Sequence, residues 1–421
     1  MKPEILSIEN NLKVLNTKMS GAESASVWIL VGVGSRYEKK DLNGIAHFAE
    51  HMFFKGTKSR PNAIDISSIV DGIGGEFNAF TSKENTGFYI KAAKKHFDLI
   101  MDLLSDMVLR SKFEQAEIGR ERGVIAEEFR MYLDTPVSYI RDLFEQLLYG
   151  DQPLGWDIVG NLNSLKNINR EQFLEYLNSY YNPSNMLVSI AGGVEKPLEV
   201  VRKYLGKMED KKSKNFSKVE LEQKEPRVKL FKKDTQQAQL CLGFRGYPRG
   251  HKNRYELTVL NAILGASMSS RLFIQVRERR GLAYYVRTGV EEYYDTGYFV
   301  AQAGVEPKNI NEAVKVTLGE FQKISVESVS EKELSKAKEY IKGKLILELE
   351  DSKDVAAMFG MQQLLENKIR TPEEIMEKID RVTADDIKEV AKDIFRNEKL
   401  NLAIIGPYKE EGEFVKILTL E

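Results

Sequence analysis

Apolar and polar positions alternate along the chain with two different periods. Residues 27–33 form a short apolar run that is typical of a buried strand, whereas residues 98–108, 114–134, 331–350 and 384–395 repeat their apolar positions at the spacing of amphipathic helices. The strict succession of strand, helix and strand that marks a parallel sheet is absent. The pattern predicts an α+β fold built from largely antiparallel mixed sheets, each with helices packed on one face.

Three segments of the first half recur in the same order in the second half, about 210 residues further along. The matching pairs are 26–31 with 239–244, 86–89 with 296–299, and 186–192 with 400–406. A chain of 421 residues also exceeds the size at which a single hydrophobic core stops growing. We therefore expect two homologous domains, residues 1–210 and residues 225–421.

Residues 208–224, between the two copies, are rich in Lys, Glu, Asp and Ser and poor in apolar side chains. This composition predicts an exposed linker between the domains. The alternative is a charged surface loop inside one domain.

Charge and composition exclude several classes of protein. Lys and Arg total 62 and Asp and Glu total 63, so the net charge of -1 does not favour binding to nucleic acid or to an anionic membrane. The one cysteine, Cys241, cannot form an internal disulfide. No apolar stretch approaches the length of about 18 residues that spans a membrane, and the first residues lack the pattern of a signal peptide. We expect a cytoplasmic protein with no membrane partner.

The pattern His47-x-x-Glu50-His51 is the strongest chemical signal in the chain. On a helix, residues four apart share a face, so both imidazoles can bind one metal ion while Glu50 projects beside it. The neighbouring residues are largely apolar, and an apolar helix rarely buries two imidazoles and a carboxylate without a common partner. The pattern predicts a metalloprotease centre with one zinc ion per chain. The alternative is a solvated helix face.

A catalytic zinc has three protein ligands and one position for water, so a third ligand is needed. Residues 118–132 have one apolar stripe, made of Ile118, Ile125, Phe129 and Tyr132. At about 100° per residue, Glu121 and Glu128 lie within roughly 50° of the centre of this stripe, and Glu127 lies on the opposite face. We assign Glu128 as the third ligand and Glu121 as the carboxylate that orients a ligating imidazole. The alternative is that both carboxylates border the core and reach solvent.

Glu50 lies between the two histidines at a different height on the helix, so it cannot conveniently be a ligand as well. It is placed to take a proton from zinc-bound water, whose pKa the metal lowers toward about 7. Hydrolysis of a peptide bond is the expected reaction. A zinc-dependent protein that holds peptides without cutting them is an alternative function.

The residues around this pattern resemble a known family. The order His-x-x-Glu-His is that of the inverzincins, and residues 44–57 closely resemble the pitrilysin/insulinase family, especially its processing-peptidase branch. The resemblance covers both halves of the chain. It implies that a glutamate of a downstream helix completes the zinc site and that another glutamate, seven residues earlier, supports it, which matches Glu128 and Glu121.

The resemblance also implies further site residues. Residues 74–81 resemble the family's edge strand, which pairs with an extended substrate through its backbone, so Asn78 and Ala79 would contact the peptide. Phe54 matches a residue that lines the pocket just past the scissile bond and favours bulky apolar side chains there. Residues 277–284 resemble the family's arginine and tyrosine pair. Arg277 and Tyr284 would therefore complete the active site and stabilise the developing oxyanion.

The second half has no His-x-x-Glu-His pattern, so the resemblance implies one catalytic copy and one supporting copy. Longer members of the family carry four such domains, which enclose a chamber, and the arginine and tyrosine come from the fourth. We expect a homodimer, or a heterodimer with a related chain, in which Arg277 and Tyr284 of one subunit reach the zinc of the other.

The chain departs from the mitochondrial processing enzyme at the two acidic positions that read a substrate arginine, because Ser138 and Asp142 stand there. One charge remains, so we expect a general endopeptidase that acts on unfolded peptides or protein segments. The competing function is a non-catalytic scaffold or partner subunit of the same fold. All the residues assigned above to zinc binding and catalysis are present, which argues against a loss of the chemistry.

Overall fold

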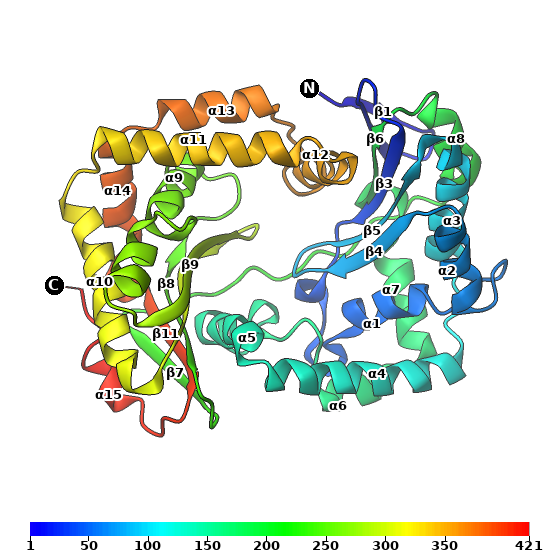
Figure 1. The fold of residues 1–421 in the computed structure, drawn as a ribbon. Coiled ribbons are helices and arrows are strands. Elements are labelled where there is room, and N and C mark those ends of the chain that lie inside the picture. The colour runs from blue at the N-terminus through cyan, green and yellow to red at the C-terminus, as the bar shows by residue number, and fades with distance from the viewer. Residues whose placement is uncertain (421) are drawn as a thin grey trace. The chain divides into compact units, whose positions relative to one another are not determined.

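The computed structural model describes residues 1–420, and the chain divides into two compact units. The first unit comprises Met1–Arg130, Trp156–Ser217 and Ile346–Pro372, and the second comprises Met131–Gly155, Lys218–Leu345 and Glu373–Glu421. Figure 1 labels the helices and strands of both units. Each unit consists of one sheet with helices packed against it.

The described residues of the first unit form a six-stranded sheet in the order β1-β2-β6-β3-β5-β4. The strands are β1 (Glu4–Ser7), β2 (Lys13–Lys18), β3 (Ser24–Val31), β4 (Glu76–Thr81), β5 (Thr86–Ala93) and β6 (Met186–Gly192). β2 and β6 run parallel, and the other neighbouring pairs are antiparallel. β4 pairs with β5 alone, so its outer backbone groups form one edge of the sheet.

Helices cover both faces of this sheet, which explains the continuous apolar run of β3. Val27 and Ile29 point into the main core, and Trp28 and Leu30 point to the opposite face. The main core is closed by α1 (Ile45–Phe53), α2 (Ala63–Gly72), α3 (Phe97–Arg110), α4 (Gln115–Asp134), α7 (Arg170–Tyr180) and α8 (Pro197–Leu205). The opposite face packs against Phe359 and its neighbours on α12 (Ser352–Glu366). A strand buried on both sides has no polar face to show.

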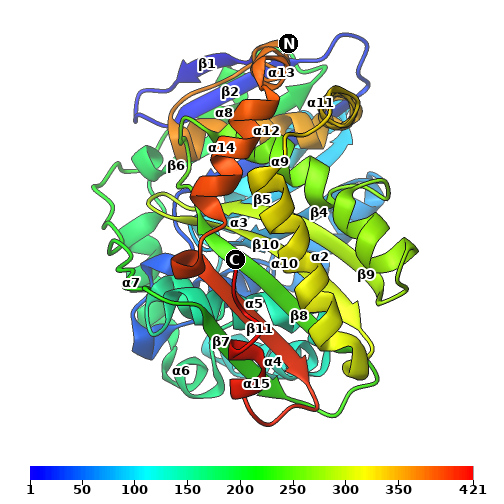
Figure 2. The same ribbon diagram turned by 90° about the vertical axis from the view of Figure 1, so that its left-hand side faces the viewer.

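The second unit repeats this plan. Its described strands have the order β7-β11-β8-β10-β9, with β7 and β11 parallel and the other pairs antiparallel. They are β7 (Arg227–Lys232), β8 (Ala238–Gly246), β9 (Ala283–Glu292), β10 (Gly297–Val305) and β11 (Leu400–Gly406). One face packs against α9 (Arg254–Gly265), α10 (Ile310–Val326) and α14 (Ala384–Ile394), which lie toward the viewer in Figure 2. The other face packs against α5 (Pro136–Tyr149).

Apart from β1, the two sheets have the same strand order, because β2-β6-β3-β5-β4 in the first corresponds to β7-β11-β8-β10-β9 in the second. Each pair of segments that resemble each other in sequence occupies equivalent strands: β3 and β8, β5 and β10, and β6 and β11. The predicted α+β fold of two sheet-and-helix domains is therefore confirmed. The structure adds the helix on the second face of each sheet.

These added helices come from the opposite halves of the sequence. α5 lies in residues 1–210 but packs in the second unit, and α12 lies in residues 225–421 but packs in the first. The domain limits 1–210 and 225–421 describe the sequence repeat and stay a prediction. The compact units differ from them, because each unit includes one helix from the other half of the sequence. The physical reason is that each sheet has a second apolar face, which must be covered.

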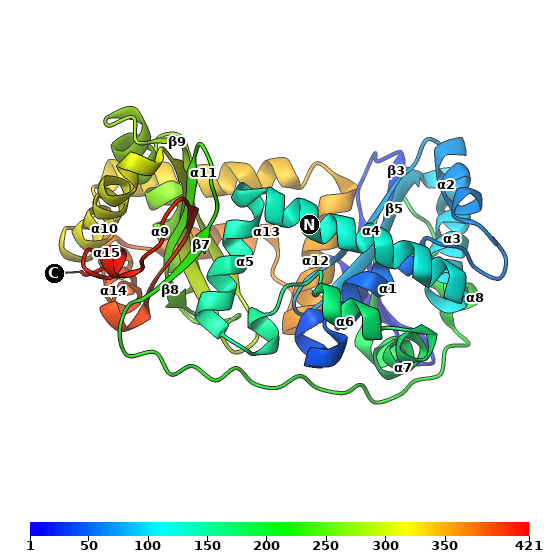
Figure 3. The ribbon, with the colours of Figure 1, turned by 90° about the horizontal axis from the view of Figure 1, so that it is seen from below.

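The expected linker has no helix or strand between residues 209 and 224 (Figure 3). Most of its side chains are exposed. Each end is tied to its own unit. In the first unit, the guanidinium of Arg36 lies 4.0 Å from the ring centroid of Phe216. In the second, the backbone N–H of Val219 donates to Asp295 at 2.9 Å. Across residues 1–420, no helix is both long and apolar enough to cross a membrane.

Candidate metal centre

The helix that carries the two histidines begins at a capped turn. Gly44 precedes α1 with φ of +96°, and a Cβ there would lie 2.6 Å from the carbonyl oxygen of Val159, so this position requires glycine. The buried carboxylate of Glu38 accepts hydrogen bonds of 2.8 Å from the backbone N–H groups of Gly44 and Ala46. It also accepts one from the Asn43 side chain at 2.9 Å. Burial outweighs these bonds and raises the pKa of Glu38 to about 7.

α1 presents its apolar side to the main core. Phe48 packs edge-on against Phe173 of α7 with ring centroids 5.0 Å apart, and Phe53 packs against Phe88 of β5 at 4.9 Å. These aromatic contacts fix the rotation of the helix about its axis. His47, Glu50 and His51 are consequently turned toward the partner helix α4.

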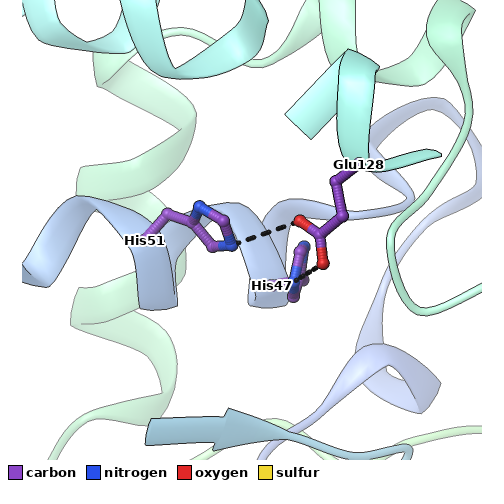
Figure 4. Close-up of side chains that lie close together, drawn as sticks. All are labelled: His47, His51 and Glu128. Carbon is purple, nitrogen blue, oxygen red and sulfur yellow. Dashed lines mark ion pairs between the residues drawn. The ribbon is translucent and has the colours of Figure 1, made fainter. Parts of the chain in front are cut away.

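Glu128 of α4 faces both histidines, as Figure 4 shows. Its Oε1 lies 3.7 Å from Nε2 of His47, and its Oε2 lies 3.5 Å from Nε2 of His51. One ligand atom from each of the three residues lies within 4.8 Å of the others. Among residues 1–420, this is the one such group of histidine, cysteine and carboxylate side chains.

The geometry fits a zinc ion. Tetrahedral ligands at about 2.0–2.2 Å from zinc are about 3.4 Å from one another, which is close to the two nitrogen–oxygen separations above. Both separations are too long for hydrogen bonds. Burial, with the neighbouring His51, lowers the pKa of His47 to about 3, so this imidazole is neutral, which is the form that binds a metal. Two imidazoles and one carboxylate are a donor set of the kind that catalytic zinc sites use.

Glu121 lies two turns before Glu128 on the same side of α4 and contacts His51. Its Oε1 lies 2.9 Å from Nδ1 of His51, and its Oε2 lies 2.6 Å from Nζ of Lys55. Burial alone would raise the pKa of Glu121, but the hydrogen bonds to His51 and Lys55 outweigh it and the pKa is lowered. Glu127, by contrast, is exposed and pairs with Arg130. Glu121 and Glu128, the two carboxylates that helical spacing indicates, therefore lie on the side of α4 that faces the histidines.

Glu50 lies beside these ligands and is held by a strand. Its Oε2 accepts a hydrogen bond of 2.5 Å from Oγ1 of Thr81, the last residue of β4. Burial raises the pKa of Glu50 more than the Thr81 and His51 contacts lower it, and the charge of Glu128 adds to the rise. A raised pKa means that the carboxylate binds a proton more readily, as a general base must.

The residues expected to bind substrate lie along β4. The Phe54 and Phe77 rings are 5.7 Å apart, so the side chain after α1 and the edge strand share an aromatic contact. Asn78 is exposed and its Oδ1 accepts a hydrogen bond of 2.9 Å from the backbone N–H of Ala79. This N–H lies on the strand that ends the sheet, where the described residues supply no neighbouring strand on the outer side.

Arg277 and Tyr284 lie in the second unit, whereas the three candidate metal ligands lie in the first. Arg277 belongs to a π-helical turn, Phe273–Glu278, and its guanidinium lies 4.7 Å from the Phe273 ring and 5.7 Å from the Tyr284 ring. Tyr284 is the second residue of β9, after Ala283, and is 75% exposed. The structure thus brings the expected arginine and tyrosine next to each other. Ser138 and Asp142 lie on α5, also in the second unit.

Three residues of the site were missed by sequence reasoning. Lys55 follows His51 by four residues and lies just beyond the end of α1, so its spacing from His51 was an available signal. Glu38 had a weaker signal, as a carboxylate a few residues before a helix. Thr81 had none, because it reaches Glu50 only through the folding of β4 over α1.

Comparisons with known proteins find similar sequences along most of the chain. Residues 13–161 match the family described as Insulinase (Peptidase family M16), and residues 167–341 match the family described as Peptidase M16 inactive domain. A Bacillus subtilis protein named uncharacterized zinc protease YmxG is 36% identical over 405 residues, which cover 95% of this chain and 97% of that protein. An uncharacterized zinc protease of Rickettsia felis is 35% identical over 412 residues, covering 97% of this chain and 98% of its own.

Solved structures share the fold. The crystal structure of a protease from Helicobacter pylori superposes with a TM-score of 0.89 and 25% identity, covering 96% of this chain and 99% of that chain. A Pseudomonas fluorescens structure described as peptidase M16 inactive domain has a TM-score of 0.89 at 18% identity, covering 97% of this chain and 99% of its own, and supports the fold alone.

Proposed function

The chain belongs to the insulinase family of peptidases, family M16, and we propose that it is a zinc metalloendopeptidase that cuts unfolded peptides or unfolded protein segments. The observation that carries the proposal is the convergence of His47, His51 and Glu128 beside the carboxylate of Glu50. A ligand set without a general base would fit a structural metal. The presence of Glu50 at the same place favours hydrolysis.

In this proposal His47, His51 and Glu128 hold one zinc ion per chain. Bound zinc acts as a Lewis acid that makes water more acidic and polarises a peptide carbonyl. Glu50 accepts the proton of the attacking water and delivers it to the leaving amine. Its Oε2 is engaged by Thr81, so Oε1 is the oxygen that moves the proton. Glu121 keeps the Nδ1 side of His51 occupied, which leaves Nε2 for the metal.

The substrate would add to the outer edge of β4 as an extended strand, because no described strand pairs with that edge, which ends at Thr81. Asn78 and Ala79 would lie against the peptide backbone. The aromatic contact between Phe54 and Phe77 supports a pocket for a bulky apolar side chain just past the scissile bond. A folded protein cannot offer an extended segment to this edge, which is why we propose unfolded substrates.

Arg277 and Tyr284 would complete the site by binding substrate and stabilising the oxyanion, as a cation and a phenol beside the reacting carbonyl can do. We propose that they act on the zinc site of a second chain in a homodimer, or in a heterodimer with a related chain. A fully active monomer at low concentration would contradict this arrangement. The processing-peptidase branch and a cytoplasmic location stay predictions from the sequence.

Metal analysis and a matched pair of variants test the proposed function. The wild-type protein should bind one zinc ion per chain and cleave an unfolded peptide library, and a chelator should stop the cleavage. Glu50→Gln should bind zinc and peptide normally but lose about 10²–10⁴-fold in turnover, because it lacks the general base. Glu127→Gln, on the exposed side of α4, is the control and should cleave like the wild type.

Two alternative functions predict other outcomes. A non-catalytic scaffold or partner subunit should neither bind zinc tightly nor cleave. For a peptide-holding protein, the wild type and Glu50→Gln should both bind zinc and peptide, and neither should cleave. If Glu50→Gln cleaves as fast as the wild type, the assignment of the general base is wrong.

A further inference from the structure

We propose that Lys55 is a positioning residue of the metal centre: it holds Glu121 in place, and Glu121 in turn keeps Nε2 of His51 directed at the metal. The inference rests on the proposed zinc function and adds a residue that the ligand set does not contain. It starts from a chain of contacts that runs from the ligand His51 through Glu121 to Lys55.

The two oxygens of Glu121 have different partners. Oε1 contacts Nδ1 of His51 at 2.9 Å, and Oε2 contacts Nζ of Lys55 at 2.6 Å. A carboxylate engaged at both oxygens cannot rotate without breaking one of these bonds. Its side chain is only 6% exposed, so water cannot readily replace Lys55 as the second partner. Lys55 therefore determines which way the carboxylate of Glu121 faces.

The two histidines differ in how they are oriented. The His47 side chain is 11% exposed and its Nδ1 is buried without a hydrogen-bond partner, so packing holds this ring. The His51 side chain is 22% exposed and has the Glu121 contact. A ring that is less enclosed depends more on a hydrogen bond for its orientation. The chain from Lys55 through Glu121 acts on the histidine that packing secures least.

The backbone beneath Lys55 is fixed. The next residue, Gly56, has φ of +111°, and a Cβ there would lie 2.3 Å from the carbonyl oxygen of Pro61. Its carbonyl accepts a hydrogen bond of 3.1 Å from Lys112. Thr57 then donates from Oγ1 to the fully buried Asp106 of α3 at 2.5 Å. The ammonium of Lys55 is thus presented from a rigid loop.

Lys55 has one other acidic neighbour on the same face of α4, and that neighbour is engaged. Glu117 pairs with Arg120, three residues further along the helix. Glu121 is the carboxylate that lies within salt-bridge distance of Lys55. Removing the ammonium would therefore leave a nearly buried carboxylate with His51 as its remaining partner.

The test measures metal affinity and does not depend on peptidase activity. Zinc dissociation constants are measured by competition with a chromogenic chelator for the wild type, Lys55→Met, Lys55→Arg and Lys58→Met. We expect zinc binding to weaken about 10–100-fold in Lys55→Met, to be restored to within a few fold in Lys55→Arg, and to stay unchanged in Lys58→Met. Lys58 is an exposed lysine of the same loop and is the matched control. Thermal melting of the metal-free proteins confirms that each variant folds.

A double-mutant cycle with Glu121→Gln tests the route. If Lys55 acts through Glu121, Lys55→Met should weaken zinc binding little further in the Glu121→Gln background. The absorption spectrum of the cobalt-substituted protein should change in both single variants, because the His51 ligand is reoriented. Unchanged zinc affinity in Lys55→Met overturns the inference, as does the same fold loss with and without Glu121. A wild-type protein that binds zinc but does not cleave contradicts the proposed function alone, and one that binds no zinc contradicts both.

Discussion

The hydroxyl of Thr81 donates a hydrogen bond of 2.5 Å to Oε2 of Glu50. Thr81 ends β4, the edge strand proposed to pair with substrate, and Glu50 is the proposed general base on α1. The strand that would hold the peptide and the carboxylate that would act on it are therefore joined directly. A shift of β4 on substrate binding would move the partner of Glu50.

Thr81→Val should lower kcat by about 10–100-fold with little change in KM, because a hydrogen bond to a charged group contributes about 1.5–3 kcal/mol and here orients the base. Thr81→Ser keeps the hydroxyl and should retain most of the activity. Steady-state kinetics on one unfolded peptide separate the two constants. A rise in KM at constant kcat would instead mean that Thr81 serves substrate binding.

Removing the carboxylate of Glu38 should change how stability depends on pH. The pKa of Glu38 is raised to about 7 in the fold from 4.5, so the folded state binds the extra proton between these values. Its contribution to stability is full below about pH 4.5 and is lost as the pH rises through about 7, a change of up to about 3 kcal/mol. Lys83 and the phenols of Tyr176 and Tyr180 are the charged or titratable groups that face it.

Glu38→Gln cannot ionise, so its free energy of unfolding should fall less than that of the wild type between pH 5 and pH 8. Denaturant titrations of both metal-free proteins at these two pH values measure the difference. Equal slopes for wild type and variant would show that Glu38 does not titrate in this range.

Asp106→Ala should destabilise the protein strongly. Asp106 is fully buried and binds Nη1 of Arg60 at 2.7 Å as well as the hydroxyl of Thr57 at 2.5 Å. Removing one partner of a buried ion pair costs about 3–5 kcal/mol, and here Arg60 keeps only the partly exposed Asp102 while the hydroxyl of Thr57 loses its acceptor. Asp102 also pairs with Arg60 but has a side chain that is 33% exposed, so Asp102→Ala should cost about 1 kcal/mol or less. Denaturant unfolding of the two variants gives both values.

Cys241 should be unreactive toward thiol reagents while the protein is folded. It lies in β8 with no exposed surface, and burial raises the pKa of its thiol to about 12, so almost no thiolate exists at neutral pH. A colorimetric thiol assay should find about one reactive thiol per chain in denaturant and almost none in buffer. Rapid labelling in buffer would contradict the buried position of β8.

The sequence alone predicts the local parts of this protein well. The helices expected at 98–108 and 114–134 are α3 (Phe97–Arg110) and α4 (Gln115–Asp134), and the repeated segments are equivalent strands of the two sheets. Local periodicity indicates which faces are buried, so it also predicts that Glu121 and Glu128 point inward and Glu127 outward, as their contacts show. It does not record which distant segment covers each face.

The sequence by itself determined the chemistry of the site, because His47, Glu50 and His51 are neighbours on one helix and their spacing needs no tertiary contact. Tertiary structure decided what surrounds them: Glu128 opposite both imidazoles, Thr81 on Glu50, and α12 behind the sheet. These contacts join residues up to hundreds of positions apart. They form because apolar faces pair across the whole chain, and no local pattern specifies that pairing.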